Sequence, residues 1–91
     1  MTEPVIHDAA SHRFSTVVDG VTAYADYSLK DGVLSIDHTI VPSEIGGRGV
    51  AGALVKAVVE HARSTGWKVH PACSYAEVWM KRHPEYASLR A

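Results

Sequence analysis

The sequence predicts an α/β fold in which an antiparallel meander of strands precedes a β-α-β-α unit with one parallel strand pair. Three observations lead to this prediction. The first part of the chain alternates apolar and polar residues around two Asp-Gly dipeptides. After Pro42 the apolar residues take up the period of a helix, and a short strand ending at Pro71 follows. A strand, a crossover helix and a second strand favour a right-handed connection between parallel neighbours.

The meander is predicted to contain three strands. Residues 13–18 read Arg-Phe-Ser-Thr-Val-Val, a composition that favours a strand, and Asp19-Gly20 suits a tight hairpin turn. Residues 21–28 alternate with period two, and Asp31-Gly32 marks a second turn before a strand over residues 33–41. A short edge strand over residues 5–7 is a further candidate. In the third main strand, four residues are expected to share one face: Leu34, Ile36, His38 and Ile40.

Two helices are predicted in the second half of the chain. Apolar residues recur at helical spacing after Gly49, and Gly66 stands where a C-terminal capping glycine belongs. Residues 67–70 then form a strand. Ser74 and Glu77 match a capping box, which predicts a helix with Ser74 as its N-cap. That helix is expected to run to about His83, because a proline follows.

Composition limits the classes of function. With 91 residues we expect one domain over residues 1–91, with residues 1–10 poorly ordered. The chain has 9 Lys and Arg against 10 Asp and Glu and no basic run, which argues against nucleic acid as a partner. One cysteine excludes a disulfide framework, and the six histidines lack metal-ligand spacing, so no metal site is expected. Without a signal peptide or a long apolar stretch, we expect a cytoplasmic protein with no membrane partner.

The glycine-rich segment Gly46-Gly47-Arg48-Gly49 is the most informative part of the chain. It follows a strand and begins a helix, where exposed backbone amides and the helix dipole favour a phosphate, and where Arg48 could add a cation. The alternative is a turn that only connects the two elements. A P-loop triplet is absent, and the Gly-x-Gly-x-x-Gly match ending at Gly52 follows an antiparallel meander, so we interpret it as accidental.

Motifs spread over the chain point to a known family. They are His38-Thr39-x-Val41-Pro42, Gly47-Arg48-Gly49-Val50-Ala51 with Leu54, Pro71-x-Cys73, and His83-Pro84-Glu85-Tyr86. From about Phe14 to Tyr86 the sequence resembles the small single-domain proteins of the YjdJ type, which belong to the GNAT superfamily of acetyl-CoA-dependent N-acetyltransferases. The resemblance implies a GNAT-like fold, acetyl-CoA as the co-substrate and an amine as the acceptor.

The resemblance also implies where CoA binds. The superfamily pattern Gln/Arg-x-x-Gly-x-Gly/Ala falls on residues 46–51, with Gly46 at the position where Gln or Arg is usual. The amides of Arg48, Gly49 and Ala51 would hold the pyrophosphate, and residues 39–41 would pair with the pantetheine arm as an added strand would. The expected cofactor-binding residues are Thr39, Ile40, Val41, Gly46, Gly47, Arg48, Gly49, Val50, Ala51 and Gly52.

Three side chains are the catalytic candidates. Cys73 precedes a helix whose dipole favours a thiolate; it could form an acetyl-cysteine, protonate the leaving thiolate or only line the pocket. The resemblance suggests that His38 acts as a base or positions the substrate, against the alternative of packing in the core. Tyr75 is a candidate proton donor for the thiolate or a wall of the pantetheine site, and the alternative is a packing residue. His70 has weaker support as a catalytic group.

Other residues are candidates for supporting roles. Lys81, Arg82 and His83 could contact the 3′-phosphate of CoA or form a solvated helix end. Trp67 and Trp79 are expected in the core.

The sequence therefore predicts an N-acetyltransferase that transfers acetyl directly to a primary amine within a ternary complex. The alternatives are a non-catalytic CoA-binding module and an interaction domain that retains the fold. Longer members of the superfamily carry N-terminal helices beside the acceptor site. Because 91 residues leave no room for them, we expect an acceptor groove that is open or completed by another chain. The acceptor and the oligomeric state are not predicted.

Overall fold

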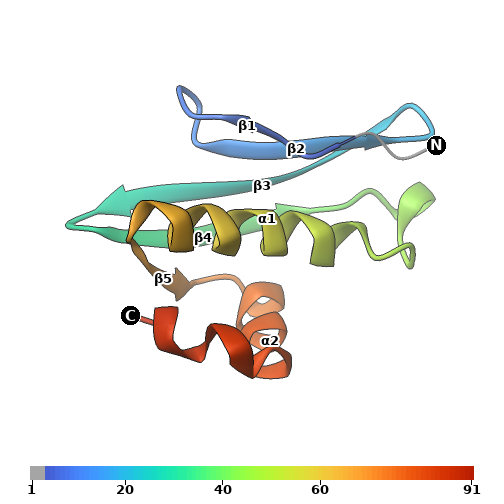
Figure 1. The fold of residues 1–91 in the computed structure, drawn as a ribbon. Coiled ribbons are helices and arrows are strands. Elements are labelled where there is room, and N and C mark those ends of the chain that lie inside the picture. Colours follow the sequence, from blue (N-terminus) through green and yellow to red (C-terminus); the bar gives the residue numbers. More distant parts are fainter. Residues whose placement is uncertain (1–3) are drawn as a thin grey trace.

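The computed structural model describes residues 4–91 and contains a five-stranded mixed sheet with helices (Figure 1). The strands lie in the order β1-β2-β3-β4-β5, antiparallel except for the parallel pair β4–β5, which confirms the predicted fold class. The strands are β1 Ile6–Asp8, β2 Arg13–Val18, β3 Val21–Lys30, β4 Val33–Ile40 and β5 Lys68–Pro71. The helices are η1 Ser43–Ile45, α1 Val50–Thr65, α2 Ser74–Arg82 and η2 Pro84–Leu89.

Both predicted hairpin turns are present. Asp19 and Gly20 have φ of 50° and 78°, and Asp31 and Gly32 have φ of 52° and 78°. Two consecutive residues with positive φ define the turn whose twist matches a two-residue hairpin, and Asp-Gly adopts it readily. The two turns therefore fix the register of β2, β3 and β4.

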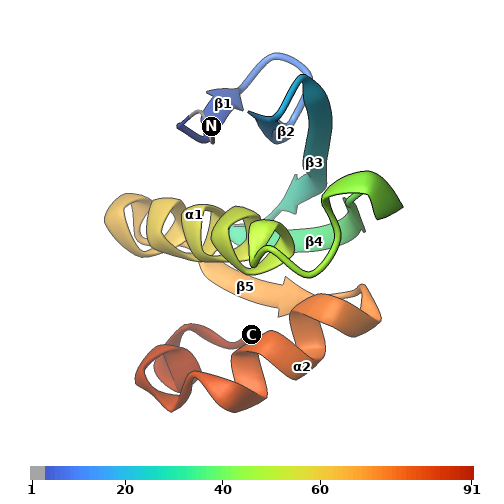
Figure 2. The same cartoon turned by 90° about the vertical axis from the view of Figure 1, so that its right-hand side faces the viewer.

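The first ten residues, for which the sequence predicts poor order, are only partly described. Residues 1–3 lie outside the described part of the chain, and Ile6–Asp8 forms the edge strand β1, one residue later than expected. A short turn over residues 9–12 joins β1 to β2. Consequently no helix lies between these two strands (Figure 2).

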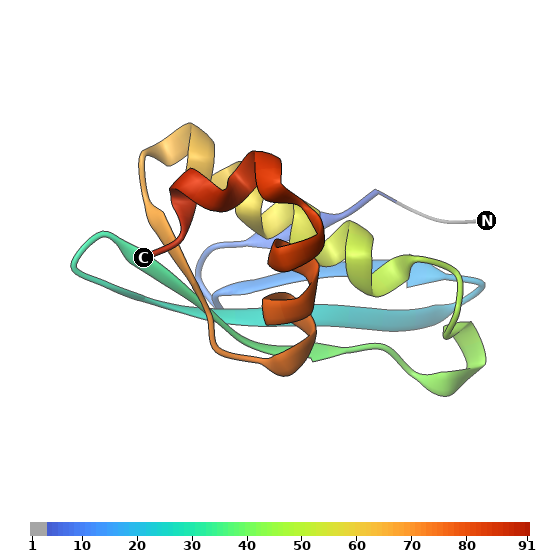
Figure 3. The ribbon, with the colours of Figure 1, turned by 90° about the horizontal axis from the view of Figure 1, so that it is seen from below.

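The core lies between one face of the sheet and α1. Figure 3 shows α1 above this face, with α2 and η2 along the β5 edge. The apolar stripe of α1 is buried, as its spacing predicts, and Gly66, with φ of 81°, caps its C-terminus. Trp79 is buried, and Trp67 is partly buried against the core. Over residues 4–91, no helix covers the opposite face of the sheet, which we call the uncovered face.

A β-bulge in β4 makes one prediction wrong. Tyr27 of β3 pairs with Ile36, but the preceding residue, Asp26, pairs with His38, so Asp37 is an extra residue in β4. An extra residue reverses the alternation of side chains beyond it. His38 and Ile40 therefore lie on the uncovered face, not beside the buried Leu34 and Ile36.

The N-cap of α2 is a second correction. Cys73 has extended φ and ψ of −86° and 150°, and its Sγ accepts a hydrogen bond from the Ala76 amide at 3.4 Å. Ser74, the predicted cap, is already in the helix, and Glu77 binds Arg90 instead of reaching back. The capping-box pattern located the helix correctly but placed its cap one residue too late.

Candidate active site at the start of helix α1

A cleft of about 270 Å³ opens at the N-terminus of α1. Gly47 and Gly49 have φ of 78° and 76°, a conformation that favours glycine, and they turn the chain into the helix. Gly49 is the N-cap and contributes no side-chain hydrogen bond. The cleft is lined by Val41, Gly46, Gly47, Gly49, Val50, Ala51 and Tyr75.

Backbone amides at this cleft can bind an anion. The first hydrogen bond of α1 runs from the Ala53 amide to the Gly49 carbonyl at 3.1 Å. The three amides before Ala53, which begin with Val50, therefore have no partner inside the helix. Together with the positive end of the helix dipole, they form a site suited to a phosphate group.

The side chain of Arg48 is directed elsewhere. Its guanidinium forms an ion pair with Asp19 in the turn between β2 and β3. Arg48 is not among the residues lining the cleft. A contact between this guanidinium and a bound phosphate would therefore require it to leave Asp19.

Between β4 beyond Ile36 and the start of α2 the strand pairing has a gap, which we call the slot. The parallel pairing of β4 with β5 ends at Ile36 and Pro71, and the Cys73 amide then donates to the Ile36 carbonyl at 3.0 Å. Beyond Ile36, residues 37–40 of β4 have no partner in β5. A strand edge without a partner can pair with an extended ligand as an added strand would, and the Cys73 side chain contacts this edge at Thr39.

Two of the three catalytic candidates lie at this site. The Cys73 Sγ is partly buried and lies 3.5 Å from the Thr39 Oγ1, across the slot. Tyr75 lines the cleft and is 41% exposed. His38 is not with them, because the bulge places it on the uncovered face, opposite Asp26.

The other sequence candidates lie apart from the cleft. His70 is exposed on the uncovered face, where it pairs in register with Ser35. Lys81 and Arg82 are exposed in the last turn of α2, at the opposite end from Tyr75. The His83 ring stacks on the Trp79 ring, with 3.9 Å between the ring centroids. Across residues 4–91, no three His, Cys, Asp or Glu side chains gather as metal ligands.

Sequence reasoning missed how Gly52 and Thr39 take part in the site. A Cβ at Gly52 would lie 3.3 Å from the Tyr75 Oη and 3.6 Å from the Trp79 Nε1, so this glycine allows α1 and α2 to approach closely. A glycine inside a predicted helix is a recognisable signal of such an approach. The contact between Thr39 and Cys73 had no signal, because it depends on the bulge.

Known proteins are similar to this chain in sequence and in fold. Residues 13–89 match the sequence model of a family described as GCN5-related N-acetyl-transferase. The chain belongs to the GCN5-related N-acetyltransferase family. Protein NATD1 of Xenopus tropicalis is 32% identical over 85 residues, and the match spans 88% of this chain and 76% of that protein. NATD1 of Mus musculus is 31% identical over 84 residues, with the same shares.

A solved structure of this family has a similar fold. It is the NMR solution structure of a GCN5-like putative N-acetyltransferase from Staphylococcus aureus, which is 31% identical in sequence. The TM-score is 0.76, and the match covers 96% of this chain and 86% of that one. In the present chain, no helix among residues 4–91 is long and apolar enough to cross a membrane.

Proposed function

We propose that this member of the GCN5-related family is an acetyl-CoA-dependent N-acetyltransferase of the YjdJ type that transfers acetyl directly to a primary amine. One observation supports this above all. The cleft at the glycine-capped N-terminus of α1 is lined by Val41, directly after the stretch of β4 that has no partner in β5, and Cys73 contacts Thr39 of that stretch. This arrangement offers amides for a diphosphate and a strand edge for the pantetheine arm.

The cofactor would extend from the cleft into the slot. Its pyrophosphate would accept hydrogen bonds from the amides of Arg48, Gly49 and Ala51, which surround the start of α1. Its pantetheine arm would pair with the edge of β4 at residues 39–41. Gly52 contributes by leaving room for Tyr75, whose ring forms a wall of the cleft.

Acetyl transfer requires a neutral amine, a donor for the oxyanion, a proton donor for the leaving thiolate and a base near the thioester. The neutral amine forms a bond to the carbonyl carbon, and a backbone amide near Ile40 stabilises the resulting oxyanion. The carbon–sulfur bond then breaks, and the CoA thiolate takes a proton from Tyr75 or Cys73. The amine loses its proton to His38 or to water. Because His38 lies on the uncovered face, it acts as base only for an amine that arrives from that side.

Cys73 either forms an acetyl-cysteine intermediate or takes part in direct transfer without being acetylated. Its Sγ caps α2 by accepting from the Ala76 amide, and it contacts Thr39. An acetyl-cysteine intermediate would give a mass increase of one acetyl group after mixing with acetyl-CoA. Direct transfer predicts that no such adduct accumulates.

A non-catalytic CoA-binding module is the second candidate. It is favoured by the short turn between β1 and β2, because no helix in the described chain forms a wall for an acceptor on the uncovered face. Such a module would bind acetyl-CoA but would not acetylate any amine. An interaction domain that only retains the fold would not bind acetyl-CoA.

Thermal stability with and without acetyl-CoA tests the proposal. Acetyl-CoA at 100 times its dissociation constant should raise the free energy of unfolding by about 2.7 kcal/mol. Gly49→Asp, which places a carboxylate at the cap of α1, should abolish the shift measured relative to its own unliganded form. An unshifted parent protein would refute both CoA-based functions.

Turnover separates the enzyme from the binding module. A panel of primary amines is assayed for release of CoA thiol, and Cys73→Ala is compared with Cys73→Ser. If Cys73 donates a proton, Cys73→Ala loses transfer while its acetyl-CoA affinity stays within a few-fold. Equal rates in parent and Cys73→Ala would return this residue to a structural role.

A further inference from the structure

The uncovered face of the sheet contains a groove of about 460 Å³. Its walls include Ser28 of β3, Ser35 of β4 and His70 of β5, which are neighbours in the strand register. Ser35 lies one residue before the point where the pairing of β4 with β5 ends. Ser35 is therefore the lining residue that lies nearest along β4 to the unpaired stretch beyond Ile36.

The bulge places the Asp37 carboxylate beside Ser35, one of the residues that line this groove. The Ser35 Oγ donates a hydrogen bond to the Asp37 Oδ1 at 2.8 Å. Asp37 is the extra residue of β4, and it stands two residues before Thr39, whose hydroxyl contacts Cys73. Asp37 and His38 are thus both available on the side opposite α1.

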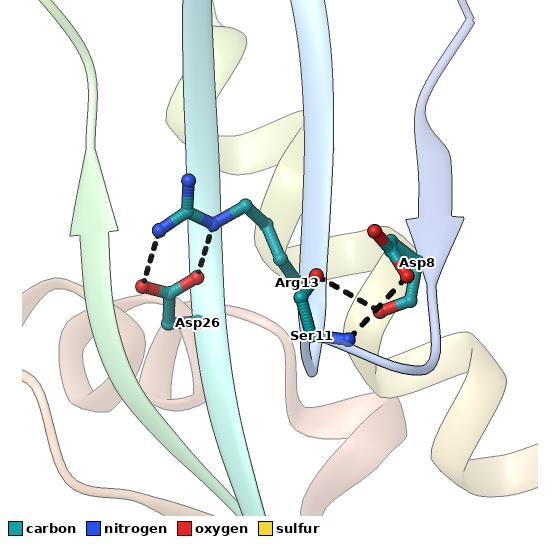
Figure 4. A network of polar contacts seen from close by, with 4 residues as sticks. All are labelled: Asp8, Ser11, Arg13 and Asp26. Atoms are coloured by element: carbon teal, nitrogen blue, oxygen red, sulfur yellow. Dashed lines mark hydrogen bonds and ion pairs between the residues drawn. The ribbon is translucent and has the colours of Figure 1, made fainter.

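Asp37 differs from the other half-buried carboxylates in having no arginine partner. Over residues 4–91, four carboxylates are half-buried: Asp26, Asp37, Glu60 and Glu77. Three of them bind an arginine, as Asp26 does with Arg13 at 2.7 Å (Figure 4). Asp37 has the Ser35 hydroxyl and forms no ion pair with a described Lys, Arg or His.

A half-buried carboxylate without a cation carries a cost. Partial burial removes water from the charge, and one hydroxyl donor replaces only part of the lost hydration. A cation that arrives from solution offsets this cost when it binds, since a charge-assisted hydrogen bond to a carboxylate is stronger than a neutral one. Asp37 therefore has the properties of a binding site for an external cation with N–H donors.

We propose that Asp37, positioned by Ser35, binds the ammonium group of the acetyl acceptor, which reaches the slot across the uncovered face. This inference rests on the proposed transferase function and adds a positioning residue for the acceptor, whose ammonium group gives one proton to His38 or to water before its nitrogen attacks the thioester. CoA occupies the cleft on the α1 side, and the acceptor occupies the groove on the other side. The two meet at the edge of β4 beside Cys73.

Binding of n-butylammonium chloride, followed in ¹⁵N spectra of the labelled protein, tests the proposal without acetyl-CoA. We expect saturable shifts at the amides of Ser35 and Asp37, and no such shifts with 1-butanol, which is neutral and of similar size. Asp37→Asn should weaken binding at least tenfold. Asp31→Asn is the matched control, because Asp31 is the carboxylate that lines the groove itself and asparagine tolerates its φ of 52°.

The outcomes are distinct. Equal dissociation constants for parent and Asp37→Asn, or equal responses to butanol and butylammonium, overturn the proposal. If Asp37→Asn does not fold, Ser35→Ala replaces it, with weaker butylammonium binding expected because the carboxylate loses its hydroxyl donor.

Kinetics separate this proposal from the transferase function. In Asp37→Asn the KM for butylamine should rise at least tenfold, while the dissociation constant for acetyl-CoA stays as in the parent. An unchanged KM would refute the role of Asp37 and leave the transferase standing. A parent protein that binds butylammonium but never acetyl-CoA would refute the transferase and leave the amine site.

Discussion

Gly52→Ala should raise stability and at the same time weaken cofactor binding. Gly52 lies inside α1, where replacing glycine by alanine favours the helix by about 1 kcal/mol. The new methyl group would lie 3.3 Å from the Tyr75 Oη, the end of a side chain that is 41% exposed. Its distance of 3.6 Å to the Trp79 Nε1 is ordinary contact. Tyr75 can therefore move by a few tenths of an ångström while Trp79 stays in place.

The magnitude follows from these two terms. After the small cost of moving Tyr75, we expect a gain of about 0.5–1 kcal/mol in the free energy of unfolding. For a domain of this size, 1 kcal/mol corresponds to a shift in Tm of about 4–8 °C. Because Tyr75 lines the cleft, its displacement should reduce the stabilisation that acetyl-CoA provides.

Thermal unfolding with and without acetyl-CoA measures both effects. Ala53→Gly, at the adjacent exposed position, is the control and should lower stability by about 1 kcal/mol through helix propensity alone. A Tm of Gly52→Ala several degrees below that of the parent would refute the reasoning. It would mean that the approach of α1 and α2 cannot adjust at this point.

Three other substitutions test local features. Cys73→Ala should lower the free energy of unfolding by about 0.5 kcal/mol because the Ala76 amide loses its acceptor, whereas Cys73→Ser should keep or raise it. The pKa of His7 is lowered below 6.5 by burial and then by His61, so stability should fall as the pH drops from 7 through this lowered pKa, and His7→Gln should reduce that dependence. Gly66→Ala should cost about 1 kcal/mol because φ is +81°, as urea unfolding would show.

Each of these has an outcome that contradicts it. Equal stability of the alanine and serine variants at position 73 would argue against the cap. The ring centroids of His7 in β1 and His61 in α1 lie 4.4 Å apart. If the stability of His7→Gln and of the parent protein depends on pH in the same way, this pair is not the source of the pH dependence. His70→Gln is the control at an exposed histidine. Gly66→Asn should lose less than Gly66→Ala, since asparagine tolerates positive φ better.

The regular parts of the fold could be predicted because their signals are local. Asp19-Gly20 and Asp31-Gly32 specify a turn by their own backbone preferences, and the stripe on α1 needs only the helical period. The glycine segment likewise marked the start of α1. The family motifs were found for the same reason, because they are short and keep a fixed order.

The bulge could not be predicted from residues 33–41. Alternation of apolar and polar residues continues through Asp37 without a break, so nothing in the pattern marks the extra residue. The bulge is visible only in the pairing with β3, a non-local contact. The error affected His38 directly, since a shift of one residue moves a side chain to the other face.

The change of face within β4 also governs how the two substrates could exchange. A ligand held along Thr39 approaches from the helical layer, and a ligand held at Asp37 approaches from the opposite layer. In the proposed arrangement the two ligands reach β4 from different layers, so neither has to leave before the other enters. Deleting Asp37 would restore simple alternation and keep Thr39 opposite Ala25 in the helical layer, but it would remove the carboxylate from the opposite layer, so only the ligand held at Asp37 would lose its site.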